Sequence, residues 1–287
     1  MAHTHLISAD ELKALQASGA PLMVFDCSAE LGNPAKADEM FAARRIVGAV
    51  QAHLERDLSA HDPAHAINGG RHPLPTREHF AAWLTAMGFN NAMQAVVYDR
   101  NGANYCGRLW WMLKWMGHDA VAVLDGGLQA WEAAGGAVES GPAPAPAAPG
   151  NFVLKTPLRR LVQTDEVVQG LGRDTQTLID ARGAPRFRGD TEPLDPIAGH
   201  IPGALNRPFT DNLGADGRFK PREQLKAEFD ALLAGRDAAG VVHHCGSGVS
   251  AVPNVLAMEL AGYAPAGLYA GSWSEWSRTP GLPAARG

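Results

Sequence analysis

Cysteine is scarce in this sequence, with three residues, Cys27, Cys106 and Cys245, in a chain of 287. They are too few and too scattered to form a disulfide framework or a zinc site. The pattern is typical of a reducing compartment, in which a single cysteine can serve as a nucleophile. The sequence therefore predicts a cytoplasmic protein and implies neither a metal nor an organic cofactor.

Long hydrophobic runs are also absent. No segment approaches the roughly 20 apolar residues that a helix needs to cross a bilayer, and the N-terminal segment lacks the cationic start and apolar stretch of a secretory signal. The formal net charge of −5 argues against nucleic acid or an anionic membrane as a partner. With 46% hydrophobic and 19% charged residues, the composition is that of a globular protein long enough for two domains.

What the sequence does contain is an internal duplication. Four segments of the first half recur in the second half, in the same order and 145 to 155 residues further on. Collinear copies at this separation indicate two copies of one domain rather than a solenoid. The pairs join Asp26, at the end of an apolar run, with Asp180, residues 44–50 with 199–205, residues 95–99 with 241–245, and residues 124–131 with 269–276.

A segment rich in proline and alanine, GPAPAPAAPG at 141–150, lies between the two copies. Its alternating prolines favour an extended, semi-rigid linker. On each side, apolar strand-like runs alternate with helical patterns, such as the helix that the capping box of Ser8 and Glu11 predicts. Strands that alternate with helices predict an α/β fold, with a mainly parallel sheet flanked by helices. We therefore predict an N-terminal domain at 1–140, the linker, and a C-terminal domain at 151–287.

Cys245 follows directly on a buried-strand signal, VVHH, and precedes a glycine-bearing turn and a helix-like run. In this geometry the main-chain N–H groups of the loop and the N-terminus of the helix converge on the sulfur and stabilise the thiolate. Gly246 and Gly248 lack Cβ atoms, so the loop can curl tightly around the sulfur. At the matching place in the first half stands Asp99, where a cysteine would be needed for the same chemistry. The sequence therefore predicts a nucleophile in the second copy and a catalytically silent first copy.

The loop CGSGVSA resembles the active-site loop of sulfurtransferases of the rhodanese superfamily, in particular those that act on 3-mercaptopyruvate, with Ser250 where threonine is common. The segments GHIPGALNRPF, WWMLKWMGHDAVAVLDGG and GSWSEW are similar to motifs of the same superfamily, so the likeness covers nearly the whole chain. It implies two tandem rhodanese-like domains, the first silent and the second active. Thiosulfate sulfurtransferases of the superfamily instead carry a cationic pair after the cysteine.

The resemblance also implies a reaction. The Cys245 thiolate would take the outer sulfur of a small donor, 3-mercaptopyruvate or thiosulfate, and hold it as a persulfide. A thiol such as thioredoxin or glutathione, or cyanide, would then remove the sulfur. Transfer from thiosulfate to cyanide as the main activity is the alternative. The loop residues expected to surround the substrate are Gly246, Gly248, Val249 and Ser250.

Two arginines that follow the strand ending in Asp180 are candidates for binding the donor. Arg186 matches the substrate-binding arginine of the family, and its planar fork suits a carboxylate or a sulfonate. Arg188 is a second candidate. Relatives that act on mercaptopyruvate often carry another arginine about nine residues after the first, where this chain has Asp195. The site is therefore expected to depart from the family pattern at this position.

The resemblance further implies a relay of a serine, a histidine and an acid. Ser247 matches the loop serine, and His72 in GGRHPLP matches the histidine of the first domain. The acidic member falls in HLERDLS, where Glu55 and Asp57 are both candidates. Such a relay would handle the proton of the donor thiol.

A cysteine after a strand is also typical of cysteine phosphatases and arsenate reductases. Their loop places an arginine six residues after the cysteine to hold the phosphate, and this chain has Ala251 there. A non-catalytic sulfur carrier would be expected to have a blocked cysteine loop or no substrate arginine, and the second half shows neither. The loop residues, rather than analogy of fold, therefore favour the sulfurtransferase.

Overall fold

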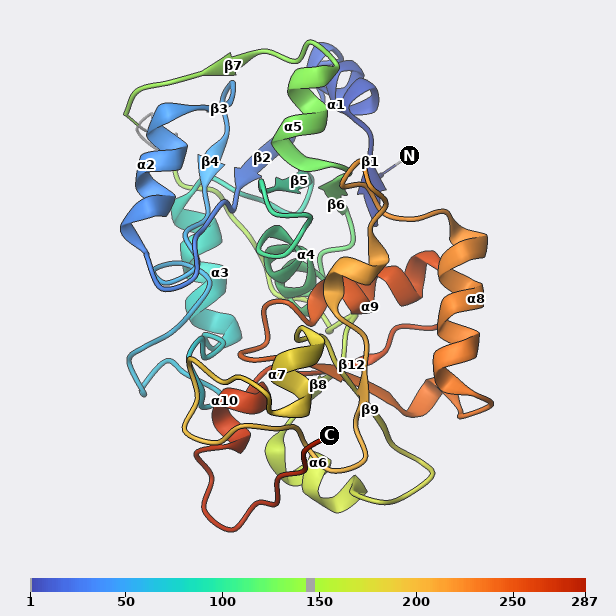
Figure 1. Ribbon diagram of the computed structural model, residues 1–287. Coiled ribbons are helices and arrows are strands. Elements are labelled where there is room, and N and C mark those ends of the chain that lie inside the picture. The colour runs from blue at the N-terminus through green and yellow to red at the C-terminus, as the bar shows by residue number, and fades with distance from the viewer. Residues whose placement is uncertain (1, 143–147) are drawn as a thin grey trace. The chain divides into compact units, whose positions relative to one another are not determined.

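The structure, a computed structural model, describes residues 2–142 and 148–287, which fall into two compact units (Figure 1). The main boundary lies between Leu158 and Arg159. Residues 66–74 belong to the second unit and residues 216–218 to the first. Residues 143–147 of the predicted linker lie outside the described residues.

The first unit contains a five-stranded parallel sheet with the strand order β1-β6-β5-β2-β4. Strands β3 and β7 form a separate antiparallel pair. Helix α1 begins directly after Ser8, whose side chain forms the predicted capping box with Glu11. The elements of this unit are β1 Leu6–Ile7, α1 Ala9–Ala17, β2 Leu22–Asp26, α2 Ala35–Ala43, β3 Arg45–Ile46, β4 Val50–Gln51, α3 Arg77–Ala86, β5 Gln94–Tyr98, α4 Cys106–Trp115, β6 Val121–Leu124, α5 Gly127–Ala133 and β7 Val138–Glu139.

The second unit repeats this plan with a five-stranded parallel sheet in the order β10-β9-β11-β12-β8. The parallel sheets confirm the predicted α/β fold class, because their strands alternate with helices along the chain. The elements are β8 Leu161–Val162, α6 Thr164–Gly170, β9 Thr177–Asp180, α7 Ala184–Arg188, β10 Leu205–Asn206, the 3-10 helix η1 Phe209–Asn212, α8 Arg222–Leu233, the 3-10 helix η2 Ala238–Gly240, β11 Val241–His244, α9 Val252–Leu260, β12 Gly267–Tyr269 and α10 Ser272–Trp276.

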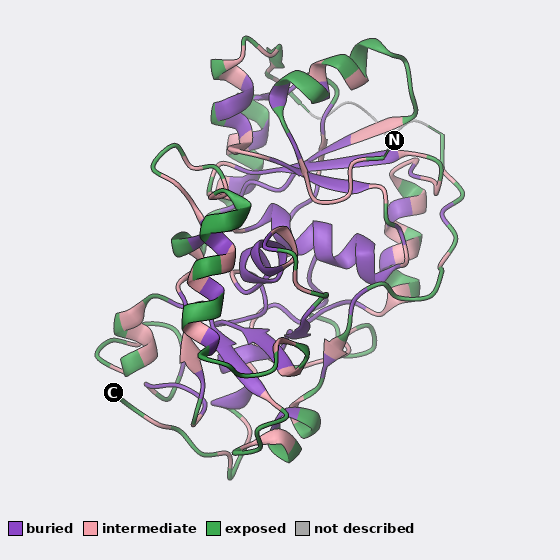
Figure 2. Cartoon of the chain, turned by 90° about the vertical axis from the view of Figure 1, so that its right-hand side faces the viewer, coloured by how far each residue is buried: buried purple, intermediate pink, exposed green. Residues whose placement is uncertain are grey.

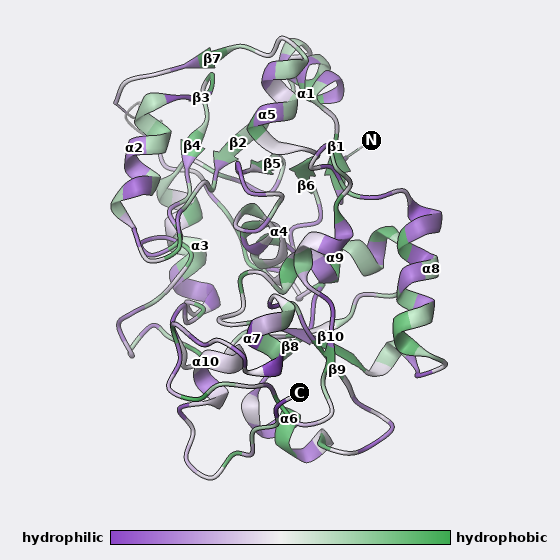
Figure 3. Cartoon of the chain, viewed as in Figure 1, coloured by the Kyte–Doolittle hydropathy of each residue, from purple (hydrophilic) through white to green (hydrophobic). Residues whose placement is uncertain are grey.

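Helices cover both faces of the second sheet. Successive strand residues point to opposite faces: Val241 packs with Phe229 of α8, whereas Val242 packs with Trp273 of α10. The central strands β9 and β11 are therefore buried along their whole length, as the purple strands of Figure 2 illustrate. Helix α8 keeps one apolar and one polar side, visible as alternating green and purple in Figure 3.

Parallel strands end at one edge of the sheet, and this edge carries the loops of interest. In the second unit β9 and β11 pair in register, with His244 opposite Asp180. The residue after His244 is Cys245, and the residue after Asp180 opens the loop that leads to α7. The register therefore brings the Cys245 loop and the arginine-bearing segment to the same edge.

In the first unit the loop after β5 is organised by Asp99. Its carboxylate accepts four main-chain hydrogen bonds, from the N–H groups of Asn101, Ala103, Tyr105 and Cys106, at 2.8, 3.1, 2.8 and 2.9 Å. Asp99 is 1% exposed. The loop thus forms a small anion-binding hollow, which the protein fills with its own side chain.

The segment at 66–74 is fixed to helix α10 of the second unit. The N–H of Gly69 donates to Glu275 Oε1 at 2.8 Å, and the N–H of Arg71 donates to Ser274 Oγ at 3.0 Å. Gly70 between them has φ +92°, and a Cβ there would lie 2.5 Å from Ser274 Oγ. Glycine is therefore required at Gly70, both for the backbone conformation and for the close approach.

Replacing the carboxylate that fills the hollow tests its structural role. Asp99→Ala leaves four buried N–H groups without an acceptor, and we expect the free energy of unfolding to fall by roughly 2–4 kcal/mol. Urea denaturation measures the change. Asp38→Ala is the matched control, because Asp38 forms an exposed ion pair with Arg56 in the same unit and its loss should cost less than about 1 kcal/mol. Equal stability of the two variants would contradict this account of the loop.

Candidate active site at the Cys245 loop

Cys245 lies between β11 and α9 and is 2% exposed. Its N–H donates to Ser272 Oγ at 3.1 Å, and its carbonyl accepts from the N–H of Trp273 at 3.0 Å. The next carbonyl, that of Gly246, accepts from the N–H of Ser274 at 2.8 Å. The start of the loop is therefore held by three hydrogen bonds to the first turn of α10.

Two main-chain N–H groups of this loop differ from their counterparts in the first unit. Within the described part of the chain, no group accepts from the N–H of Ser247 or Val249. Their counterparts in the repeat, Asn101 and Ala103, donate to Asp99. The loop of the second unit therefore offers hydrogen bonds to an anion at the position of the Cys245 side chain.

Gly248 allows the loop to close in this way. It has φ +72°, and a Cβ on it would lie 2.3 Å from the carbonyl oxygen of Ala270. A larger residue would strain the backbone and push the loop away from β12. Gly248, which the sequence predicts to allow a tight turn, is therefore required both for its backbone conformation and for the close approach to Ala270.

The structure brings Ser247 and His72 together. Ser247 Oγ lies 2.7 Å from His72 Nδ1, and both residues are buried, at 6% and 3% exposure. His72 can do this because its segment, residues 66–74, belongs to the second unit. A serine hydroxyl joined to an imidazole can accept and pass on a proton next to the cysteine.

The acidic member of the relay stays a prediction. Glu55 Oε2 pairs with His61 Nε2 at 2.9 Å, and Asp57 Oδ2 accepts from the N–H of His53 at 2.7 Å. Burial raises the pKa of the Asp57 carboxyl above its ordinary value. Both acids belong to the first unit.

The two predicted arginines lie in different surroundings. Arg186 Nη1 comes within 3.4 Å of the position that a Cβ on Gly246 would take, so this guanidinium reaches the cysteine loop. Its Nη2 donates to Glu192 at 2.7 and 3.0 Å. Arg188 instead forms an exposed pair with Asp190 at 2.7 Å. Residues two apart on a helix face different ways, so α7 brings Arg186 to the loop but not Arg188.

Two further residues, Arg71 and Ser272, shape the site and have no role in the sequence-based prediction. Arg71 Nη2 lies 3.0 Å from the Cβ position of Gly246, and Arg71 also pairs with Asp195. The carboxylate of Asp195 has no exposed surface. Ser272 holds Cys245 and has φ +54°, a conformation that is rare for a residue with a side chain. Its counterpart in the first unit, Gly127, has φ +60°. A glycine at the matching position of the repeat therefore indicated a left-handed backbone conformation at Ser272.

The remaining histidines and cysteines near the strands are structural. Burial lowers the pKa of His243 to about 3 and also lowers that of His244, so both rings are neutral at physiological pH. Burial likewise raises the pKa of the Cys27 and Cys106 thiols well above their ordinary range. Neutral, buried thiols are poor nucleophiles. These four side chains therefore do not compete with Cys245 for chemistry.

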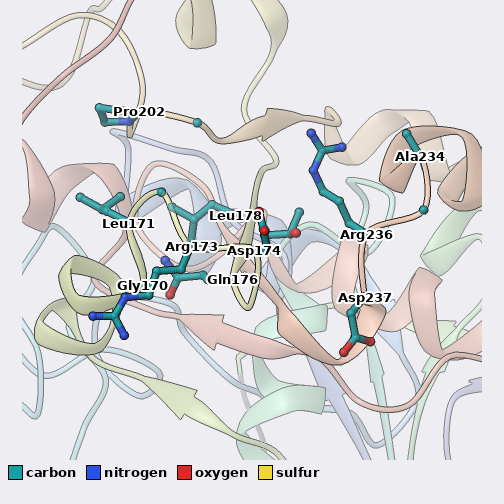
Figure 4. A pocket seen from close by; sticks show the side chains of 14 residues that line it. Gly170, Leu171, Arg173, Asp174, Gln176, Leu178, Pro202, Ala234, Arg236 and Asp237 are labelled. Carbon is teal, nitrogen blue, oxygen red and sulfur yellow. The ribbon is translucent and has the colours of Figure 1, made fainter.

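A surface pocket of about 490 Å³ lies elsewhere in the second unit (Figure 4). Thr177 and Leu178, at the beginning of β9, line it together with residues that end α6 and follow α8. It therefore opens at the edge of the sheet opposite to Cys245, and none of the predicted site residues contributes to it. Across the described residues, no three His, Cys, Asp or Glu side chains are grouped to hold a metal ion, and no helix has the length and hydropathy to span a membrane.

Comparison with known proteins identifies the fold and the relatives. A model of the rhodanese-like domain matches residues 8–134 and 163–279. A Pseudomonas aeruginosa protein named "Probable 3-mercaptopyruvate sulfurtransferase" is 45% identical over 288 residues, covering 100% of both chains. The human 3-mercaptopyruvate sulfurtransferase is 34% identical over 276 residues, covering 93% of this chain and 89% of its own. The Arabidopsis thaliana "Thiosulfate/3-mercaptopyruvate sulfurtransferase 2" is 36% identical over 234 residues, covering 74% and 68%.

Solved structures agree with these relatives. The 3-mercaptopyruvate sulfurtransferase of Leishmania major superposes with a TM-score of 0.82 at 30% identity, covering 96% of this chain and 74% of its own. The SseA sulfurtransferase of Escherichia coli superposes with a TM-score of 0.77 at 30% identity, covering 95% and 100%. The matches confirm the resemblance inferred from the loop and strand-end motifs.

Two substitutions at Ser272 separate the backbone conformation from the hydrogen bond. Both Ser272→Gly and Ser272→Ala remove the acceptor of the Cys245 N–H, and we expect each to slow sulfur uptake roughly tenfold. Alanine keeps a Cβ at a positive φ, so its variant should be less stable than the glycine variant by about 1 kcal/mol. Rapid-mixing rates and urea denaturation measure the two effects. Wild-type rates in both variants would show that the hydroxyl does not position Cys245.

Proposed function

The chain is a sulfurtransferase of the rhodanese family, with a rhodanese-like domain in each half, and from this we propose that it moves a sulfane sulfur from 3-mercaptopyruvate to an acceptor through a persulfide on Cys245. The observation that carries the proposal is the Cys245 loop, in which the N–H groups of Ser247 and Val249 have no acceptor among the described residues. In the silent unit the counterparts of these two groups, the N–H groups of Asn101 and Ala103, donate to Asp99.

The first half-reaction forms the persulfide. The Cys245 thiolate attacks the sulfur of 3-mercaptopyruvate, an S–S bond forms, and the C–S bond breaks with its electron pair going to carbon. The proton of the donor thiol passes by way of Ser247 and His72 to the enolate carbon, which gives pyruvate. The loop N–H groups stabilise the negative charge on the outer sulfur.

The second half-reaction returns the enzyme to its starting state. An acceptor thiolate, from thioredoxin, glutathione or a similar thiol, attacks the outer sulfur and leaves as a persulfide, while Cys245 becomes a thiolate again. Cyanide accepts the sulfur in the same way and forms thiocyanate. We propose the cytoplasm as the compartment, because reduced thiols are available there and keep Cys245 reduced.

The charge of the site favours mercaptopyruvate over thiosulfate. In the ion-pair network that reaches Gly246, four guanidiniums meet three carboxylates, which leaves one net positive charge: Arg71, Arg182, Arg186 and Arg278 with Asp180, Glu192 and Asp195. A single carboxylate neutralises this charge, whereas the thiosulfate dianion leaves an uncompensated charge in a partly buried place. Thiosulfate as the main donor is the alternative, and the Arabidopsis relative carries both donors in its name.

The mass of the intact protein tests whether Cys245 is the nucleophile. After treatment with mercaptopyruvate, we expect the intact protein to gain the mass of one sulfur atom, and Cys245→Ser to gain none and to lose turnover. The double variant Cys27→Ala/Cys106→Ala is the control, because it retains Cys245 and should still gain one sulfur. Turnover by Cys245→Ser at the wild-type rate would refute the assignment.

The donor and its arginine are tested together by kinetics. We expect the wild-type kcat/KM to be higher for mercaptopyruvate than for thiosulfate. Removing a charge-assisted contact costs roughly 1.5–3 kcal/mol, so Arg186→Ala should lower kcat/KM for mercaptopyruvate about ten- to a hundredfold. Arg188→Ala is the matched control on the same helix, and its exposed pair with Asp190 predicts less than a twofold change. A wild-type preference for thiosulfate would overturn the choice of donor.

A further inference from the structure

Only some of the guanidinium N–H groups of Arg71 donate hydrogen bonds to the protein. Its Nη1 donates to Asp195, whereas its Nε is buried and has no hydrogen-bond partner among the described residues. Its Nη2 faces the cysteine loop, 3.0 Å from the Cβ position of Gly246. A buried N–H without an acceptor costs free energy, and such a group is expected where a ligand supplies the acceptor.

A second guanidinium faces the same point. Arg186 Nη1 lies 3.4 Å from the Cβ position of Gly246, and its Nη2 reaches Asp195 Oδ2 at 3.3 Å. Asp195 therefore holds Arg71 by one oxygen and Arg186 by the other. The shared carboxylate keeps the two guanidiniums side by side. Arg71 Nη2 and Arg186 Nη1 remain directed at the cysteine loop.

The backbone of Arg71 is fixed as firmly as its side chain. The N–H of Arg71 donates to Ser274, and Gly69, two residues earlier, donates to Glu275. The residue that follows is His72, which pairs with Ser247. One short segment thus delivers a cation and a proton-handling group to the same side of the cysteine loop.

We propose that Arg71 and Arg186 together bind the carboxylate of the donor, and that Asp195 is the positioning residue that sets the two guanidiniums at the required spacing. This inference rests on the function proposed above. Two planar forks offer more parallel N–H groups to a carboxylate than one, which fixes its orientation as well as its position. The bound carboxylate lies beside Gly246, so the donor sulfur three carbons away is brought next to Cys245.

The test compares donors with and without a carboxylate on the full-length protein. For Arg71→Ala we expect the KM for mercaptopyruvate to rise about ten- to thirtyfold with a smaller change in kcat. Inhibition by pyruvate, which has the same carboxylate, should weaken by a similar factor. Persulfide formation from inorganic polysulfide, an anion that has no carboxylate, should fall by a smaller factor than that from mercaptopyruvate. Arg71→Lys keeps the charge and should recover part of the loss.

Asp195→Asn tests the positioning role, because it keeps both arginines but removes their shared charge. We expect its KM for mercaptopyruvate to rise by a larger factor than its rate with polysulfide changes. Arg160→Ala is the control, since Arg160 forms an exposed pair with Glu166 in the same unit and should behave as wild type.

Different outcomes separate this inference from the proposed function. Wild-type KM and pyruvate inhibition in both Arg71 variants would overturn the inference, and so would an equal loss of rate with both donors, which would mean a structural role. Failure of the wild-type protein to take sulfur from mercaptopyruvate would instead overturn the proposed function.

Discussion

The structure depends on a loop of main-chain N–H groups that closes around a negative charge at the carboxyl edge of a parallel sheet. Such a loop is costly to leave empty, because each buried N–H loses its hydrogen bond to water. Each unit of the duplicated chain places a different side chain at the centre of this loop. In the first unit Asp99 provides a permanent charge and takes four N–H groups. In the second unit Cys245 stands in its place, and in the proposed function the charge comes from the thiolate or from the sulfur that it carries. On this proposal, one geometry serves stability in one copy and chemistry in the other.

The second unit is assembled from distant parts of the chain. The segment at 66–74 lies between β4 and α3 of the first unit in the sequence, yet it packs on α10, and Gly69 and Glu275 are 206 residues apart. This exchange places His72 beside Ser247, and it requires Gly70 at the point of closest approach. A second copy cut out at the linker would keep Cys245 and Arg186 but lose both His72 and Arg71. The two halves are therefore duplicated in fold but not separable in their site residues.

Much of the fold could be predicted because its signals are local or repeated. The capping box of Ser8, the strand before Cys245 and the paired strand ends all follow from short patterns, and the duplication doubles each of them. The Cys245 loop could be recognised for the same reason. The environment of Arg71 could not, since its contact with Asp195 joins residues 124 positions apart and follows no periodicity. Ser272 is an intermediate case. Its counterpart Gly127 marks a left-handed position, but only the structure shows that the Ser272 hydroxyl accepts a hydrogen bond from the Cys245 N–H.

Asp195 shows how a departure from a family pattern can be compensated elsewhere. The sequence suggests the loss of a cation at this position, because relatives that act on mercaptopyruvate often have an arginine there. In the structure the carboxylate of Asp195 instead becomes the counter-ion of Arg71, Arg186 and Arg278. Without this carboxylate, which has no exposed surface, the three guanidiniums around it would repel one another. The negative charge thus makes it possible to crowd cations beside the cysteine loop, and the net charge of the site remains matched to one carboxylate.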